Sequence, residues 1–209
     1  MRILAVSDVV VERLYSPEVT SLFSHVDLIL GCGDLPYEYL EFLVSSFNVP
    51  LLYVPGNHDP AYNARQLTAH AEGCDNIDGR VLRVKGLTFA GLGGGIRYHP
   101  NRPNQYSQTQ MWWRLALLAP SLVWNRLRYA GVLDIMVAHS PPRGIHDDTD
   151  QAHTGFDAFV SLIKIFKPRY FLHGHTMVAS PNLEPAVFQL GETKIININP
   201  YRLLEIENV

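Results

Sequence analysis

Short apolar runs, each followed by a polar side chain at a turn, recur along the whole chain. Their length and apolar composition are typical of buried strands in an open α/β sheet. Five of them lead to a residue that can bind a metal: Ile3–Val6 to Asp8, Leu28–Leu30 to Asp34, Leu51–Val54 to Asn57, Leu133–Val137 to His139, and Tyr170–Leu172 to His175. Open α/β sheets bind ligands at the carboxyl ends of their strands, so we expect these side chains at such an edge.

The third run leads into the turn that carries the densest polar chemistry. Pro55 and Gly56 end the strand, and Asn57, His58 and Asp59 follow in succession. A backbone that bends sharply here projects Asn57 and His58 off the edge of the sheet. An amide, an imidazole and a carboxylate in a row have no packing value, so we interpret this turn as a functional one.

Helical patterns separate the strands and predict βαβ crossovers. The expected helices are a short one from Pro17 to about Ser24 with Ser16 as its cap, one from Pro36 to before Pro50, a polar one over 61–71, one over 107–128 broken at Pro120, and one from about Gly155 to Lys167. Hairpins are predicted over 81–90 and over 186–199. The alternation indicates the α/β class.

The glycine-rich stretch Gly91–Ile96 invites comparison with a nucleotide-binding loop. Its sixth position is Ile96 rather than Gly, and no capped helix follows it. We therefore expect a flexible loop used for close backbone packing in preference to phosphate binding, with a place on the rim of the site left open.

Composition indicates one ordered domain over residues 1–209. The chain is 47% hydrophobic, has a net charge of -3 and contains no long Lys/Arg run, so we expect neither duplex nucleic acid nor a membrane as a partner. Its first residues lack the regions of a signal peptide, which predicts a cytoplasmic location. Two cysteines, Cys32 and Cys74, are too few for a disulfide framework.

The segment 107–128 concentrates all three tryptophans of the chain. Trp112, Trp113 and Trp124 lie among several leucines, while Arg114 and Pro120 argue against a membrane span. We favour core packing for these indoles over a homodimer contact through 107–128, since large aromatic side chains suit both.

The polar residues at the strand ends resemble the calcineurin-like metallophosphoesterases over nearly the whole chain. That family's blocks read Asp-x-His, Gly-Asp, Gly-Asn-His-Asp/Glu, His and Gly-His-x-His, and this chain carries Asp8, Gly33-Asp34, Gly56-Asn57-His58-Asp59, His139 and Gly174-His175. The resemblance implies a four-layer α-β-β-α sandwich of two mixed β-sheets flanked by helices, around a two-metal site. Arg143-Gly144 and Lys167-Pro168-Arg169 resemble the small phosphodiesterase branch.

The resemblance also implies metal ligands. Asp34 matches the carboxylate that bridges both metals, and Asn57, His139 and His175 match the other ligands of the second metal. Imidazole, amide and carboxylate ligands together suit Mn, Fe or Zn. This second site is complete.

The first metal site departs from the family pattern. Asp8 matches one of its ligands, but the family's histidine in the first block is Val10 here, and the last histidine of the final block is Met177. We therefore expect one tightly bound divalent metal and a second that is weak or absent, unless His146 or another residue of the loop after His139 substitutes.

The remaining candidates concern catalysis and the substrate. The resemblance implies that His58 donates a proton to the leaving group or stabilises phosphoryl charge, while Asp59 fixes its tautomer or orientation. It places His153 near the substrate, and Arg143, of the branch-like Arg143-Gly144, joins it as a substrate-binding candidate.

The leading functional prediction is a metal-dependent hydrolase of a small phosphoester, in particular a phosphodiesterase that uses metal-bound hydroxide. The alternative is a catalytically weak or inactive protein of the same fold that serves as a binding or scaffold module. Val10 and Met177 favour the alternative, whereas His58 and the complete second site favour the enzyme.

Overall fold

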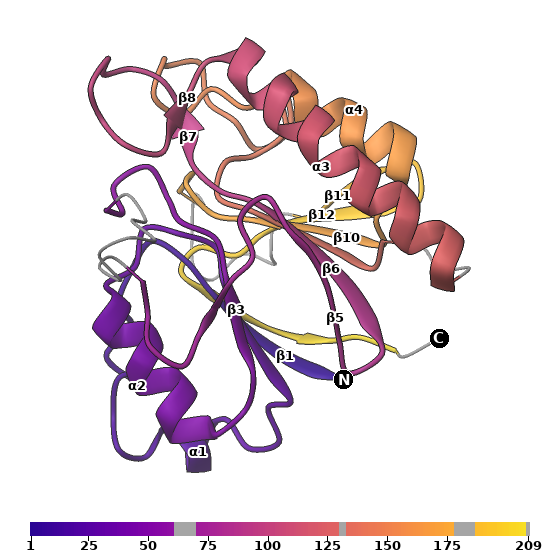
Figure 1. Ribbon diagram of the computed structural model, residues 1–209. Coiled ribbons are helices and arrows are strands. Elements are labelled where there is room, and N and C mark those ends of the chain that lie inside the picture. The colour runs from indigo at the N-terminus through magenta and orange to yellow at the C-terminus, as the bar shows by residue number, and fades with distance from the viewer. Residues whose placement is uncertain (61–69, 130–132, 178–186, 208–209) are drawn as a thin grey trace.

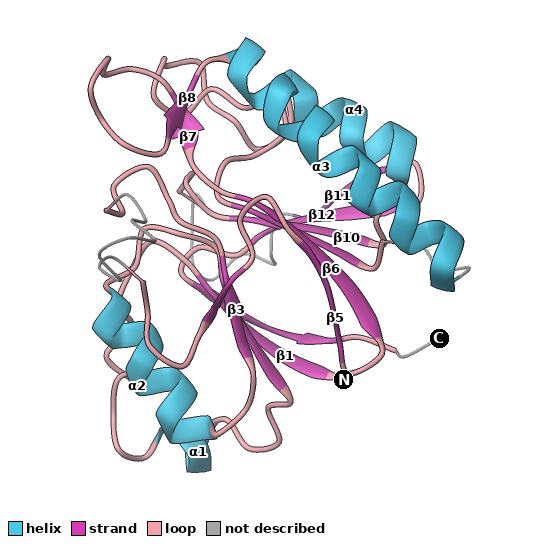
Figure 2. Ribbon diagram, in the orientation of Figure 1, coloured by secondary structure: helices cyan, strands magenta, loops and turns pink. Residues whose placement is uncertain are grey.

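The computed structural model describes residues 1–60, 70–129, 133–177 and 187–207. Two β-sheets pack face to face, and helices cover the outer face of each (Figures 1 and 2). Three apolar clusters fill the three spaces between these four layers, because the buried strands carry apolar side chains on both faces. The expected α-β-β-α sandwich of two mixed sheets is confirmed.

The first sheet has the strand order β13-β1-β2-β3-β4. Strands β1 to β4 run parallel, and β13 pairs antiparallel with β1, so the last strand lies beside the first. Their bounds are Arg2–Val6 for β1, Leu28–Gly31 for β2, Leu51–Tyr53 for β3, Asp75–Asn76 for β4 and Tyr201–Glu205 for β13.

The second sheet has the strand order β11-β12-β10-β9-β6-β5. Its four inner strands run parallel, and the two edge strands are antiparallel to their neighbours. The bounds are Val81–Val84 for β5, Leu87–Leu92 for β6, Ile135–Ala138 for β9, Tyr170–His173 for β10, Val187–Leu190 for β11 and Thr193–Asn197 for β12; β7 (Gly95–Ile96) and β8 (Gln105–Tyr106) form a separate small ladder.

Helices α1 (Val19–Leu22) and α2 (Tyr37–Phe47) cover the first sheet, while α3 (Gln108–Tyr129) and α4 (Asp157–Phe166) cover the second (Figure 1). Helix α2 begins directly after Pro36, and its C-cap Asn48 is in the left-handed conformation. No helix in the described part of the chain is long and apolar enough to cross a membrane.

Three expectations about the helices need correction or fall outside the described residues. Helix α1 begins at Val19 and has no side-chain cap, so Ser16 does not start it. The helix predicted over 61–71 lies mostly in the undescribed segment 61–69. Helix α3 continues through Pro120, whose ring is on the exposed face, and packing of Leu118 and Leu122 beneath it holds both halves in line.

The expectation that the tryptophans fill the core is wrong. Met111, Leu115, Leu118 and Leu122 form the buried stripe of α3. Trp113 lies two residues from Met111, about 200° around the helix, and Trp124 lies two from Leu122, so both indoles face outward.

Candidate metal centre and cleft

The carboxyl ends of the parallel strands of both sheets meet at one edge of the sandwich. Asp8, Asp34 and Asn57 follow β1, β2 and β3, while His139 and His175 follow β9 and β10. Asp34, His139 and His175 bring one ligand atom each to within 4.8 Å of one another. Residues far apart in the sequence therefore form one cluster, because the two sheets face each other with these ends aligned.

His139 lies at the centre of the cluster and is fully buried. Its Nδ1–H donates to the carbonyl oxygen of Cys32 at 2.8 Å, which leaves Nε2 directed at the other ligands. Nε2 lies 2.9 Å from Asn57 Oδ1 and 3.4 Å from Asp34 Oδ2. The structure thus brings the amide, the carboxylate and the imidazole together.

His175 closes the cluster from β10. Its ring centroid lies 4.7 Å from that of His139, and its Nε2 lies 2.8 Å from the carbonyl oxygen of Ala152. Donation from Nε2–H to that carbonyl leaves Nδ1 as the nitrogen with a free lone pair. Its backbone N–H donates to both oxygens of Asp8, at 3.1 and 2.9 Å.

Strained backbone marks the same residues. Asp8, Asp34 and His175 have positive φ angles of 65°, 55° and 67°. This conformation costs a non-glycine residue on the order of 1–3 kcal/mol and persists where the surrounding structure requires it. Next to His175, Gly174 is irreplaceable, since a Cβ there would collide with Ser7 and with the Asp8 carboxylate.

The charges of the cluster are strongly coupled. Burial alone would lower the pKa of His139, but the Asp34 carboxylate, which is charged and hydrogen-bonded to it, raises that pKa to about 9. Burial works against ionisation of Asp34 as well, yet His139 and the donors of His58 hold its pKa well below the usual range. Burial lowers the pKa of His175 to about 3 and raises that of Asp8.

His58 lies on the open side of Asp34. Its side chain is 65% exposed, and its Nδ1 lies 2.7 Å from Asp34 Oδ2. Nε2 lies 3.1 Å from the hydroxyl of Tyr98, which also accepts from the Asn57 amide at 3.2 Å. Tyr98 is a site residue that the sequence did not indicate, because it lies 40 residues from His58 in an irregular loop.

Asp59 does not contact the His58 ring, whose tautomer or orientation we expected it to fix. Its Oδ2 accepts the backbone N–H groups of Asp34 at 3.0 Å and Gly56 at 2.8 Å. The carboxylate that contacts the His58 ring is that of Asp34. Asp59 therefore ties the turn after β3 to the turn after β2 and acts on His58 only through Asp34.

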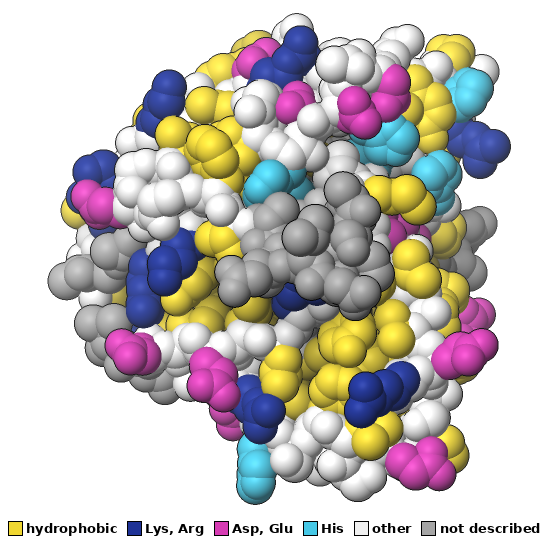
Figure 3. Space-filling model, turned by 180° about the vertical axis from the view of Figure 1, so that it is seen from behind, with side chains coloured by type: hydrophobic (Ala, Val, Ile, Leu, Met, Phe, Trp, Pro, Cys, Tyr) yellow, Lys and Arg dark blue, Asp and Glu magenta, His cyan; other side chains and the backbone are white. Residues whose placement is uncertain are grey.

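A cleft of about 900 Å³ opens over the cluster. The described residues that line it are Asp8, Val9, Asp34, Leu35, Pro36, Tyr37, Glu38, His58, Asp59, Pro60, His153, His175, Met177 and Asn199. None of these is Lys or Arg. On the face drawn in Figure 3, the described Lys and Arg side chains are scattered among acidic ones rather than gathered in a patch.

The remaining candidates divide between the cleft and its surroundings. His153 lines the cleft with its ring centroid 5.1 Å from that of His175, and Asp150 holds its Nδ1 at 2.7 Å. Arg143 is not among the described cleft-lining residues, and its Nε lies 4.0 Å from Asp147. His146 pairs with His173 at 2.9 Å, outside the metal cluster.

The two departures from the family pattern are also placed differently. Met177 lines the cleft and is 91% exposed. Val10 is 36% exposed and is not among the described lining residues, whereas its neighbour Val9 is. The segment after β1 therefore presents position 9, not position 10, to the cleft.

The glycine-rich stretch is buried rather than a flexible surface loop. Strand β6 extends to Leu92, and an added Cβ on Gly95 would lie 3.0 Å from Asn57 Oδ1. The expected close backbone packing is confirmed, and it lies directly behind a candidate metal ligand.

The donor set fits a divalent transition metal. It combines one carboxylate, one amide oxygen and two imidazole nitrogens, and each imidazole is oriented by a hydrogen bond from its other nitrogen to a backbone carbonyl. Such outer hydrogen bonds accompany metal-binding histidines and fix their tautomers. Asp34, Asn57, His139 and His175 are thus the residues that could hold an ion.

Comparisons with known proteins identify the family and agree with the fold. A model of the calcineurin-like phosphoesterases matches residues 1–179. The uncharacterised protein MJ1162 of Methanocaldococcus jannaschii is 24% identical over 212 residues, which span 96% of this chain and 88% of that protein. The crystal structure of TT1561 of Thermus thermophilus is similar in fold, with a TM-score of 0.64 at 20% identity over 94% of this chain and 88% of that one. A further crystal structure has a TM-score of 0.67 at 14% identity, over 97% and 94% of the two chains.

Proposed function

The chain belongs to the calcineurin-like phosphoesterase family, and we propose that it is a metal-dependent phosphodiesterase of that family's small phosphodiesterase branch. The observation that carries the proposal is the convergence of Asp34, His139 and His175 within 4.8 Å at the floor of an open cleft. Asn57 adds a fourth ligand through Oδ1, which lies 2.9 Å from His139 Nε2. A divalent Mn, Fe or Zn ion bound by these residues supplies Lewis-acid polarisation of a phosphoryl oxygen.

We infer that His58 acts on the leaving group. A carboxylate only accepts hydrogen bonds, so the contact of Asp34 Oδ2 with Nδ1 puts a proton on Nδ1 and directs Nε2 away from the cluster. Nε2 of His58 is then the atom from which a proton is donated to the departing oxygen. Tyr98 holds the ring in this orientation from the other side.

The charge of the cleft favours a diester over a monoester. Asp8, Asp34, Glu38 and Asp59 line it, and the described lining contains no cationic Lys or Arg. A diester brings one negative charge into this environment, whereas a monoester brings nearly two. One metal ion balances the former more fully.

The apolar residues of the lining also favour an apolar substituent on the phosphorus. Val9, Leu35, Pro36, Tyr37 and Met177 contribute apolar surface to the cleft. Val9 is 48% and Met177 91% exposed, so both are available to a ligand. We infer that aryl or alkyl phosphodiesters are turned over in preference to those of small polyols.

The test measures turnover of bis(4-nitrophenyl) phosphate together with metal content by plasma mass spectrometry. His58→Asn should lower turnover by about a hundredfold or more while the metal content stays the same. Asn57→Ala should lower both. His25→Asn, the same change at an exposed histidine outside the cleft, is the matched control, and Asn tolerates the positive φ of 62° found there.

A binding module without turnover is the second candidate, and the exposure of Met177 in the cleft favours it. Wild-type protein that retains its metal but hydrolyses no diester would support this alternative. Equal turnover in His58→Asn and the wild type would remove His58 from the mechanism while leaving the enzyme in place.

A further inference from the structure

Helix α3 is apolar on its outer face as well as on the face that packs against the second sheet. On the outer face Trp113 is 66%, Leu117 79%, Trp124 65% and Leu127 75% exposed. An amphipathic surface helix normally presents polar side chains there. Exposed apolar side chains in such a series mark a surface that another molecule covers.

The spacing of these residues is that of a helix packing against another helix. Trp113, Leu117, Pro120, Trp124 and Leu127 follow one another at intervals of four, three, four and three residues. This is the heptad pattern that keeps one apolar seam facing a partner helix. The seam runs along most of the 22 residues of α3.

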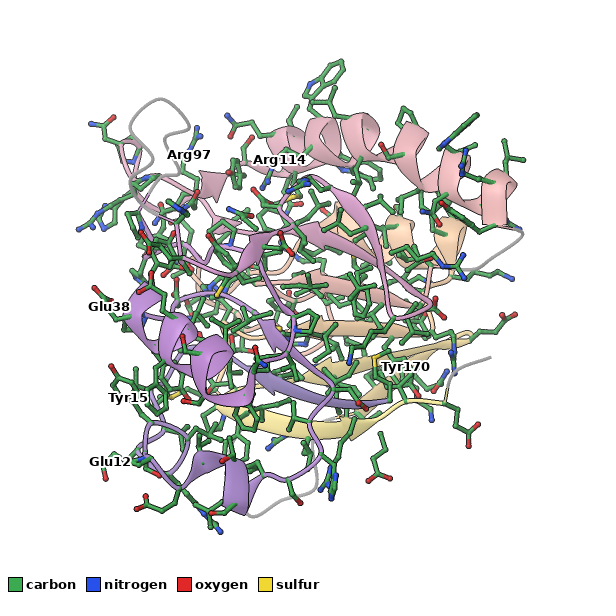
Figure 4. All side chains as sticks on the ribbon, turned by 60° about the horizontal axis from the view of Figure 1, so that its bottom comes forward. Glu12, Tyr15, Glu38, Arg97, Arg114 and Tyr170 are labelled. Atoms are coloured by element: carbon green, nitrogen blue, oxygen red, sulfur yellow. The ribbon has the colours of Figure 1, made fainter. Side chains whose placement is uncertain are left out.

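The charges along α3 select an antiparallel second copy as that partner. The helix contains no acidic residue, and two of its arginines, Arg126 and Arg128, lie in the last turn and form no ion pair with the described residues. Arg114 is turned inward, where it bonds Gly93 and pairs with Asp78, as its place between α3 and the sheets in Figure 4 shows. In a parallel pair, Arg126 and Arg128 would face their own counterparts.

An acidic residue lies at the opposite end of α3. Asp157 is exposed at the start of α4, and its backbone N–H donates to Gln108 in the first turn of α3 at 3.0 Å. An antiparallel arrangement with its two-fold axis near Pro120 brings Arg126 and Arg128 of one copy towards Asp157 of the other. We propose that α3 mediates an antiparallel homodimer through this seam.

The area is adequate for a modest dimer. A whole aromatic side chain has about 150–250 Å² of accessible surface and a leucine roughly 60–120 Å². Scaled by their exposed fractions, the residues of the seam together with Trp112 and Val123 beside it offer roughly 400–600 Å² of accessible surface per copy. Two copies would bury about 800–1,200 Å², near the lower limit of about 1,000 Å² for a specific interface. This predicts a dimer that dissociates at micromolar concentrations.

A membrane is the less favoured occupant. The chain has a net charge of -3, and Arg126 and Arg128 of α3 lie at one end of the helix instead of flanking the apolar face along its length. Interfacial helices gain much of their affinity from basic residues along the polar flank. The described cleft-lining residues include none from α3, so this dimer and the proposed hydrolysis fail or succeed independently.

Sedimentation equilibrium of the full chain tests the proposal. Leu117→Glu should raise the dimer Kd by about a hundredfold, because both copies of a two-fold symmetric dimer lose the burial of this leucine. Leu22→Glu, at an exposed leucine of α1, is the matched control and should leave the Kd unchanged. Circular dichroism of the same samples shows that each variant is folded.

The orientation is tested by charge reversal. Arg126→Glu with Arg128→Glu should weaken the dimer about tenfold, and adding Asp157→Arg should restore it. Restoration supports the antiparallel pair, and failure to restore overturns that orientation. A wild-type protein that stays monomeric at about 100 µM, roughly a hundred times the expected micromolar Kd, overturns the homodimer. Binding of the wild type, but not Leu117→Glu, to phosphatidylcholine or phosphatidylserine vesicles would overturn it too and would assign the seam to a membrane instead.

Discussion

Metal binding should release one proton and should therefore strengthen steeply with pH. In the metal-free protein the pKa of His139 is raised to about 9, so this imidazole is protonated at neutral pH. Its Nε2 proton lies between Asn57 Oδ1 and Asp34 Oδ2, in the place that an ion bound by these residues would occupy. An ion binds only after that proton has left.

The magnitude follows from this one group. The pKa of His175 is lowered to about 3, and that of Asp34 lies well below its usual range, so neither takes up a proton above about pH 6. His139 is then the one proposed ligand that titrates in this range; its unprotonated fraction rises about 75-fold between about pH 6.5 and about pH 8.5, and its contribution to the apparent affinity should rise by the same factor. A plot of log affinity against pH should have a slope of about one.

The assay is a competition titration of Mn²⁺ against a chromophoric chelator at several pH values, under argon. Calorimetry at neutral pH in two buffers of different ionisation enthalpy counts the proton directly. Asn57→Ala should lower the affinity but keep the slope, because an amide does not titrate. His139→Gln should lower the affinity and abolish the slope. A slope that survives in His139→Gln, or an affinity that is flat in the wild type, would refute the reasoning.

Three other changes probe the same region. Burial lowers the pKa of His173 to about 3, below its value of about 6.5 in the unfolded chain. The stability that the neutral imidazole contributes is therefore complete above about pH 6.5 and is lost as the pH falls towards 3. His173→Gln should reduce this loss of stability in acid, as measured by circular dichroism melts. Gly95→Ala places a Cβ 3.0 Å from Asn57 Oδ1 and should weaken Mn²⁺ binding about tenfold, and an unchanged affinity in calorimetry would contradict it. Val10→His combined with Met177→His should leave the metal stoichiometry at one after dialysis, since Val10 is not among the described cleft-lining residues, and two equivalents in plasma mass spectrometry would be the contrary result.

The parts of the fold that follow from local rules could be predicted from the sequence. The hairpin of β5 and β6 turns at Lys85 and Gly86, whose positive φ angles of 49° and 89° are those that such a turn requires. Apolar runs located the inner strands within a few residues. Because parallel strands place their carboxyl ends at one edge, strand ends also indicated where Asp34 and His139 would lie.

The parts that depend on tertiary contacts could not be predicted. Helix α3 is apolar on both sides, so periodicity alone did not show whether the side carrying Trp113 or the side carrying Leu115 faces the core. Strand β13 has the mixed composition Tyr-Arg-Leu-Leu-Glu and exists because it pairs with β1 at the edge of the sheet. The direction of the Asp59 side chain follows from the turns it bridges, which sequence adjacency to His58 does not reveal.

The structure gives Asp8 a reason to be present without a first metal. Both of its oxygens accept the backbone N–H of His175, and its own N–H donates to the carbonyl of Gly33 at 3.1 Å. Asp8 therefore joins the ends of β1, β2 and β10 and holds His175 at its strained φ of 67°. An ion at the first site would compete with this bond, and among the described residues of the cluster Asp34 would be its second carboxylate. Because Val10 is not among the described cleft-lining residues and Met177 offers only a thioether, a single-ion centre is the arrangement that this geometry favours.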